Sequence, residues 1–345
     1  MTYQPPWWLK NGLIMTIYRG LKTFPQDYPP YQEVIFTGKD HTPIAARVSV
    51  PPNPQGTIIA TYGITGDLEH EWYLHVLARL AYHHNYGVIL FDWRSHGRTL
   101  QLSAARTSDG LNEGHDFVEI AAQAQAYGCE GPIWLAGYSL GGQLAGWGLY
   151  YSQHRPDVPI VGAAILCPNL HGTHTLNHLG ASVQGRILEQ ALVKKLKHIA
   201  IAFDHYYPDP TNINNFEQID SIRSFDELFV IEALGFATVD DYYEACNLLQ
   251  LIPQLTKPLL MIYAEDDPFF PPSFIERLRS LEATCPALEL ILTAHGGHVG
   301  FIASKACQDQ YGDRDQWWAW HRVINWINNF EKTTLALDSA TRSRR

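Results

Sequence analysis

The chain has 345 residues, a formal net charge of −10, and 46% hydrophobic residues. This length suits one α/β domain that carries an insertion, and the apolar fraction is enough for a sizeable core. The acidic balance disfavours nucleic acid and anionic membranes as partners.

The five cysteines are scattered along the chain and form no CxxC pair. This pattern argues against a disulfide framework and a zinc site, and it favours a reducing compartment. No glycine-rich phosphate loop of the Walker type is present. We therefore expect a cytoplasmic protein that needs no metal and no cofactor.

The N-terminal residues lack the basic start and the small-residue cleavage pattern of a signal peptide. The apolar stretch Leu13–Tyr18 is shorter than the ~20 residues that cross a bilayer. A second set, Trp7, Trp8, Leu13, Ile14 and Met15, could touch a membrane interface, but the segment lacks the basic face that such anchors carry. The sequence thus favours packing of this segment against the domain.

Short β-branched runs alternate with longer stretches of helical spacing through most of the chain. We expect strands at Thr57–Tyr62, Gly87–Asp92, Ile133–Gly137, Ile160–Leu166, Pro258–Ala264 and Leu288–Leu292. We expect helices at Glu71–His84, Asp116–Tyr127, Leu140–Tyr151 and Asp315–Phe330. The alternation predicts an α/β fold with a mostly parallel central sheet and helices on both faces.

The stretch from His171 to Pro253 breaks this alternation, because it holds helical segments such as Arg186–Phe203 and Phe225–Leu234 but no convincing strand. We predict a helical cap inserted between two strands, over the carboxyl ends where open α/β sheets bind ligands. The expected division is an N-terminal segment packed on the core (1–30), the core (31–170 and 254–330), the cap (171–253) and a flexible tail (331–345).

The sharpest motif is Gly137-Tyr138-Ser139-Leu140-Gly141, which follows a predicted strand and precedes a predicted helix. This is the context of a nucleophile elbow, in which a serine occupies a tight strand-to-helix turn. Side chains at Gly137 and Gly141 would collide with neighbouring backbone. The turn would expose the Ser139 hydroxyl and aim the Leu140 amide at a developing oxyanion.

A serine hydroxyl needs a base, and a histidine has the suitable pKa. In a Ser-acid-His chain order the histidine follows the last strand. His298 occupies this place after two glycines that would let the loop fold back, and His295 is the rival.

The acid should follow the preceding strand, where Glu265, Asp266 and Asp267 stand together. We choose Asp267, which directly precedes the proline-containing turn, with Asp266 as the alternative. A second oxyanion donor should follow an early strand, and the amide of Ile64 next to Gly63 is the candidate.

Several ordered motifs resemble the YheT-like branch of the α/β-hydrolase superfamily. They are the opening Pro5–Gly12 with Thr16-Ile17, the loop Gly63–Gly66, the turn Asp92–Gly97, the cap pattern Ser224–Asp226, Gly235-Phe236 and Asp241–Tyr243, the acid segment Ala264–Phe269 and the histidine segment Gly297–Phe301. The chain departs from the superfamily at Tyr62, where histidine is usual. The resemblance implies a serine hydrolase of carboxylic esters, with Ser139, Asp267 and His298 as nucleophile, acid and base.

The resulting prediction is an esterase or lipase-like acyl hydrolase that acts on a small-molecule or lipid acyl ester through an acyl-enzyme. Two alternatives use the same pocket. An acyltransferase would pass the acyl group to an acceptor other than water, and a non-catalytic protein would only bind the ligand.

Overall fold

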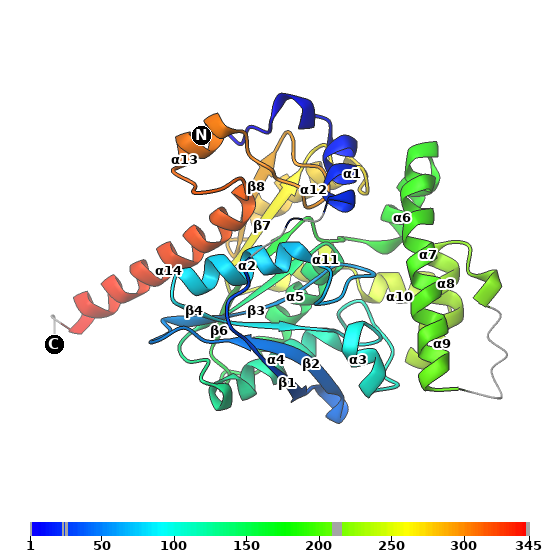
Figure 1. Ribbon diagram of the computed structural model, residues 1–345, viewed down its shortest axis with the longest axis horizontal. Coiled ribbons are helices and arrows are strands. Elements are labelled where there is room, and N and C mark those ends of the chain that lie inside the picture. Colours follow the sequence, from blue (N-terminus) through cyan, green and yellow to red (C-terminus); the bar gives the residue numbers. More distant parts are fainter. Residues whose placement is uncertain (1, 23, 25–26, 209–215, 343–345) are drawn as a thin grey trace.

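One sheet of eight strands forms the centre of the molecule, in the order β1-β2-β4-β3-β5-β6-β7-β8. The computed structural model describes residues 2–22, 24, 27–208 and 216–342 (Figure 1). The strands are β1 (Gln32–Thr37), β2 (Pro43–Ser49), β3 (Gly56–Thr61), β4 (Tyr86–Phe91), β5 (Ile133–Tyr138), β6 (Ile160–Leu166), β7 (Leu259–Ala264) and β8 (Leu288–Thr293). Strands β3 to β8 run parallel, and only β2 pairs antiparallel with its neighbours β1 and β4. The predicted α/β class with a mostly parallel sheet is confirmed.

The six strands expected from the sequence correspond to β3 to β8, whereas β1 and β2 were not predicted. Strand β1 lies at the sheet edge and buries only Phe36, so its sequence lacks a continuous apolar run. Strand β2 is buried but contains Arg47, whose guanidinium donates to the carbonyl of Leu68. A buried arginine with a carbonyl partner interrupts the apolar pattern without breaking the strand.

Helices cover both faces of the sheet. They are α1 (Gly12–Leu21), α2 (Trp72–His83), α3 (Gly97–Leu102), α4 (Glu113–Gln123), α5 (Leu140–Ser152), α6 (Gly172–Gly180), α7 (Val183–Tyr206), α8 (Ile222–Phe225), α9 (Ile231–Leu234), α10 (Val239–Ala245), α11 (Leu248–Leu251), α12 (Ser273–Thr284), α13 (Lys305–Tyr311) and α14 (Trp318–Arg342). Helices α2 and α14 pack together on one face, and α4 and α5 pack together elsewhere on the sheet. No helix in the described part of the chain is long and apolar enough to span a bilayer.

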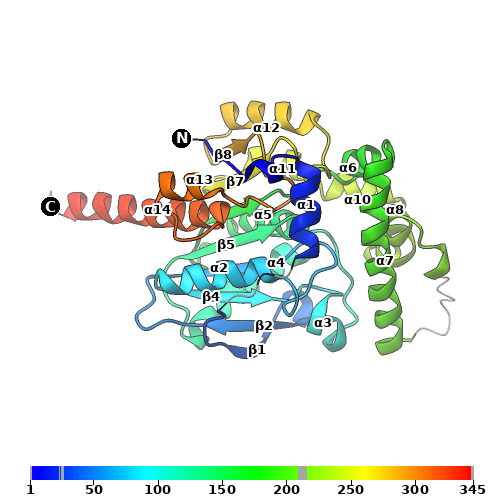
Figure 2. The same cartoon turned by 45° about the horizontal axis from the view of Figure 1, so that its top comes forward.

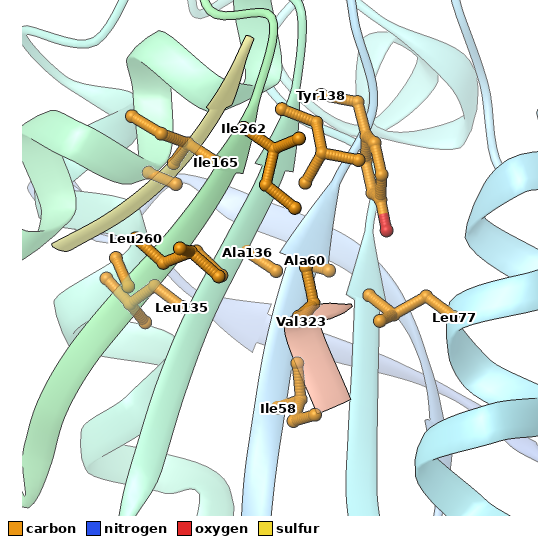
Figure 3. Close-up of a cluster of buried hydrophobic side chains, with 14 of the residues drawn as sticks. Ile58, Ala60, Leu77, Leu135, Ala136, Tyr138, Ile165, Leu260, Ile262 and Val323 are labelled. Atoms are coloured by element: carbon orange, nitrogen blue, oxygen red, sulfur yellow. The ribbon is translucent and has the colours of Figure 1, made fainter. Parts of the chain in front are cut away.

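The core lies between the strands and these helices. Figure 3 shows Ile58, Ala60 and Leu135 of the strands gathered with Leu77 of α2 and Val323 of α14. All of these side chains are fully buried. Burial of several such side chains stabilises the fold by about 1.5–3 kcal/mol for each, and it fixes the strand ends from which the site is built.

The chain between β6 and β7 contains the helices α6 to α11 and, in its described part, no strand. Its helices α6 to α10 lie to one side of the sheet (Figures 1 and 2). They share a second hydrophobic cluster, which includes Leu196, Phe203, Phe225 and Phe229 and also Leu100 from α3. Residues 209–215 of the predicted cap lie outside the described residues.

The last helix differs from its predicted range. We expected Asp315–Phe330, but α14 begins at Trp318, after Asp315 has accepted a hydrogen bond from the Trp317 amide. It continues to Arg342, so the backbone is helical in most of the segment predicted as a flexible tail. Residues 343–345 lie outside the described residues.

Candidate active site

Ser139 occupies the turn between β5 and α5, with φ 55° and ψ −125°. A non-glycine residue in this region is strained, and surrounding structure must hold it there. The glycines allow the turn. A Cβ on Gly137 would lie 2.0 Å from the Gly141 carbonyl oxygen, and a Cβ on Gly141 would lie 2.3 Å from that of Tyr62.

Three predicted site residues, each following a different parallel strand, lie in direct contact. Nε2 of His298 is 2.8 Å from Oγ of Ser139, and Nδ1 of His298 is 2.8 Å from Oδ2 of Asp267. An ionised carboxylate only accepts hydrogen bonds, so a neutral imidazole here carries its proton on Nδ1. Its Nε2 is then free to accept the serine proton.

The rival residues lie beside this group. Nδ1 of His295 is 3.5 Å from Oδ2 of Asp266, and Oδ1 of Asp266 accepts a hydrogen bond of 2.9 Å from the Gly297 amide. Asp266 therefore holds the loop that leads to His298. Asp267 contacts the His298 ring itself, and its other oxygen accepts from the Phe269 amide at 2.9 Å.

The loop after β3 lies against the serine. A Cβ on Gly63 would be 2.8 Å from Cβ of Ser139 and 3.3 Å from its hydroxyl oxygen. Within the described residues, neither the Ile64 amide nor the Leu140 amide donates a hydrogen bond to the protein. An oxyanion hole requires two amides that are free to donate close to the serine hydroxyl.

Tyr62, the departure from the superfamily pattern, has a structural partner. Its buried hydroxyl donates a 2.6 Å hydrogen bond to Asp92, which also accepts from the amides of Leu68 and Arg98. Burial raises the pKa of Asp92 to about 6, although these three hydrogen bonds act to lower it. Asp92 thus ties the loop before Ile64 to the turn after β4.

The N-terminal helix supports the histidine, which the sequence did not reveal. The His298 amide donates a 2.8 Å hydrogen bond to Oγ1 of Thr16, and the Thr16 hydroxyl donates to the Gly12 carbonyl. A Cβ on Gly12 would lie 1.8 Å from the carbonyl oxygen of Asp266, so α1 packs directly on the acid loop. The one sequence signal was Thr16-Ile17 in the resemblance to the opening motif.

We expect Thr16→Val to lower kcat by about tenfold to 100-fold, because the His298 amide loses its acceptor and a small displacement of the ring is costly. Thr16→Ser keeps the hydroxyl and should restore most of the activity. Steady-state kinetics of both variants on a soluble ester test this. Equal rates for Thr16→Val and wild type would show that the contact does not position the ring.

Cys167 lies next to the acid and the histidine. Its sulfur, a carboxylate oxygen of Asp267 and a ring nitrogen of His298 lie within 4.8 Å of one another. Burial, with the charge of Asp267, raises the pKa of the Cys167 thiol. Metals bind the thiolate form, and the His298 nitrogens already face Ser139 and Asp267, so these residues suit a neutral thiol better than a metal ligand set.

A cavity of about 430 Å³ opens in front of Ser139 and His298. Its wall is mostly apolar and includes Trp93, Phe269 and Phe270. The volume falls within the range of small-molecule sites.

Three carboxyl groups also line this cavity: Glu71, which lies 3.8 Å from the Arg19 guanidinium, Asp109 of the core and Asp226 of the helical segment. Oδ2 of Asp226 accepts a 2.5 Å hydrogen bond from the Tyr243 hydroxyl. Burial first, and then the neighbouring charge of Glu113, raises the pKa of Asp109 to about 7. Burial and the charge of Asp109 likewise raise the pKa of Asp226.

These shifts predict a pH effect on stability. A raised carboxyl pKa means that the native state keeps a proton that the unfolded chain has lost, so stability is full below about pH 4 and declines as pH rises through about 7. Asp109→Asn removes the part of this dependence that Asp109 causes. Between about pH 5 and about pH 8, the free energy of unfolding of the variant should rise by about 2 kcal/mol relative to that of wild type. This is less than the full pKa shift of Asp109 would give, because the carboxyl faces the cavity. Urea unfolding at both pH values measures it, and parallel profiles would contradict the expectation.

Comparison with known proteins shows the family to which the chain belongs. Residues 63–308 match the model of the alpha/beta hydrolase family. The chain is 42% identical to "Putative esterase slr0264" of Synechocystis sp. over 94% of both chains. It is 30% identical to YheT of Escherichia coli, which carries the same description, over 58% of this chain and 56% of that one.

Solved structures agree on the fold. The Pyrococcus furiosus esterase Pf2001 superposes with a TM-score of 0.55 at 18% identity, over 89% of this chain and 98% of that one. The family match covers most of this chain, and the slr0264 match covers nearly all of it. The chain therefore belongs to the α/β-hydrolase family and has YheT among its relatives.

Proposed function

We propose that the protein hydrolyses carboxylic esters through an acyl-enzyme on Ser139. The contact of Ser139 with His298, and of His298 with Asp267, carries this proposal. The esterase descriptions of slr0264 and YheT support the same class of reaction.

In the first half-reaction Ser139 attacks the ester carbonyl while Nε2 of His298 takes the hydroxyl proton. Asp267 holds the ring and stabilises the imidazolium that forms. The amides of Leu140 and Ile64 donate to the oxyanion of the tetrahedral intermediate, each worth about 3 kcal/mol in the transition state. The intermediate then expels the alcohol, which receives the proton from His298.

In the second half-reaction His298 takes a proton from water, which attacks the acyl-enzyme. Collapse of the second tetrahedral intermediate releases the carboxylic acid and returns the proton to Ser139. We propose that the helical segment 171–253 acts as a cap that selects the acyl group, because its residues Leu179, Leu188 and Leu192 line the same cavity as Ser139.

A p-nitrophenyl ester series of increasing acyl length tests the activity and measures the acyl pocket. A hydrolase gives a burst of p-nitrophenol, then steady release of free acid, with an optimum at the chain length that fills the cavity. Added alcohols separate hydrolysis from acyl transfer: an ester product that outpaces free acid would favour a transferase. Absence of turnover with every ester would contradict the proposal.

A further inference from the structure

The mouth of the cavity lies between α1 and α7. Among the described residues that line the cavity, those that are also exposed to solvent all belong to these two helices. They are Ile17, Gly20, Leu21, Ala191 and Lys195. Figure 2 shows α1 and α7 facing each other beside the sheet.

Apolar side chains extend from the mouth onto the outer surface. On α1, Ile14 is 50% exposed and Leu21 83% exposed, and with Ile17 they share one helix face because they stand three and four residues apart. On α7, Val183 is 64% and Ile187 65% exposed, and they continue by steps of four residues to Ala191 at the mouth. We call Ile14, Ile17, Leu21, Val183 and Ile187 the mouth patch.

Basic side chains accompany the mouth patch, although the whole chain has a formal charge of −10. Lys10 and Lys22 flank α1, which contains no acidic residue, and both are exposed. On α7 the exposed Arg186 and Lys194 stand beside the patch positions, and Lys195 lies in the cavity wall.

The acidic group in this part of α7 faces away from the patch. Oε1 of Glu189 accepts a hydrogen bond from the Ile222 amide at the start of α8. On the α1 side, Glu71 of the cavity wall lies 3.8 Å from the Arg19 guanidinium. The exposed charged side chains that α1, its flanks and this part of α7 present around the mouth are thus basic, and local charge governs attraction to an anionic surface within about 10 Å at ordinary ionic strength.

We propose that the mouth patch and its basic border dock the protein on an anionic lipid surface, so that an acyl chain can pass from the lipid layer directly into the cavity. Surface binding of this kind depends on apolar side chains that enter the headgroup layer and on basic side chains that face anionic lipids. The mouth supplies both around one apolar cavity. The docking surface does not depend on the proposed function. Only the statement that a lipid ester is the substrate rests on the proposed ester hydrolysis.

Vesicle co-sedimentation tests the surface without turnover when the vesicles consist of ether-linked lipids, which contain no ester bond. Wild type should bind vesicles of ether-linked phosphatidylcholine and phosphatidylglycerol more tightly than pure phosphatidylcholine vesicles, and added salt should weaken binding. The double variant Ile14→Glu/Ile187→Glu should bind at least about tenfold more weakly, since two exposed apolar side chains that would enter the lipid layer are replaced by charges that anionic lipid repels.

Ile35→Glu is the matched control, because Ile35 is an exposed isoleucine on the edge strand β1, away from the mouth. It should bind as wild type does. Neither Ile14 nor Ile187 lines the cavity, so the double variant and the control should hydrolyse a soluble p-nitrophenyl ester at the wild-type rate.

Equal binding to both vesicle types, or equal loss in the Ile35→Glu control, would overturn the proposal. The proposal would also be overturned if wild type formed a dimer, bound no vesicles, and became monomeric in the double variant. The mouth patch would then be an interface between two copies of the chain. Vesicle binding without hydrolysis of any ester would refute the proposed function and leave the docking surface intact. Hydrolysis of soluble ester without vesicle binding would refute the docking surface alone.

Discussion

The Ser139→Ala variant is expected to hydrolyse p-nitrophenyl esters with a kcat about 10⁶-fold below wild type, which is the loss typical when the nucleophile of a serine hydrolase is removed. The strained turn positions this hydroxyl 2.8 Å from Nε2 of His298, and alanine offers nothing that the histidine could activate. The midpoint of thermal unfolding should be nearly unchanged or slightly higher, because the substitution removes no contact that the fold needs.

Ser152→Ala is a matched control from the other end of α5. Ser152 is also buried, and its hydroxyl donates to the Leu149 carbonyl and accepts from Lys257. Its loss should lower stability by about 1 kcal/mol and leave kcat within about twofold of wild type. A Ser139→Ala protein that keeps more than a trace of the activity would show that another group is the nucleophile.

Asp267→Asn is expected to lower kcat by about 10⁴-fold. The amide of asparagine can donate to Nδ1 of His298, and the imidazole proton then lies on Nε2. A protonated Nε2 cannot accept the proton of Ser139. The carboxylate charge that stabilises the imidazolium is lost as well.

Asp266→Asn is the control that separates the two adjacent carboxyls. Oδ1 of Asp266 accepts from the Gly297 amide, and the asparagine oxygen can still do so. We therefore expect a loss of at most about tenfold in kcat. Equal losses for the two variants would contradict the assignment of Asp267, and a larger loss for Asp266→Asn would make Asp266 the acid.

Much of the site could be predicted because each residue follows a recognisable strand. Ser139 lies between two glycines whose Cβ atoms would clash, and that requirement is visible in the sequence as a motif. His298 and Asp267 follow β8 and β7, and the carboxyl ends of parallel strands meet at one edge of the sheet. The choice between Asp266 and Asp267 depends on the conformation of one turn, which residue type alone does not determine.

The support from α1 could not be predicted by local reasoning. Thr16 and His298 are 282 residues apart, and no periodicity connects a hydroxyl on an N-terminal helix with a loop amide near the other end of the chain. The hydrogen bond between Tyr62 and Asp92 could not be predicted either. Tyr62 stands where histidine is usual, and its hydroxyl contacts a residue of a different loop.

The surface around the mouth shows the same limit. From the sequence we expected an apolar N-terminal segment without a basic face. Lys10 and Lys22 flank α1, and α7 adds Arg186, Lys194 and Lys195. Only the packing of the two helices around one cavity brings these two sets of basic residues to the same surface.

The most direct test of the central claim is labelling of the wild-type protein with a fluorophosphonate, followed by peptide mapping. The adduct forms only on a serine whose hydroxyl is activated by a neighbouring base and whose oxyanion is stabilised. We predict one adduct per chain, on the peptide that contains Ser139, and none in Ser139→Ala. Folded protein that takes up no probe, or that carries the adduct on a different residue, would contradict the account.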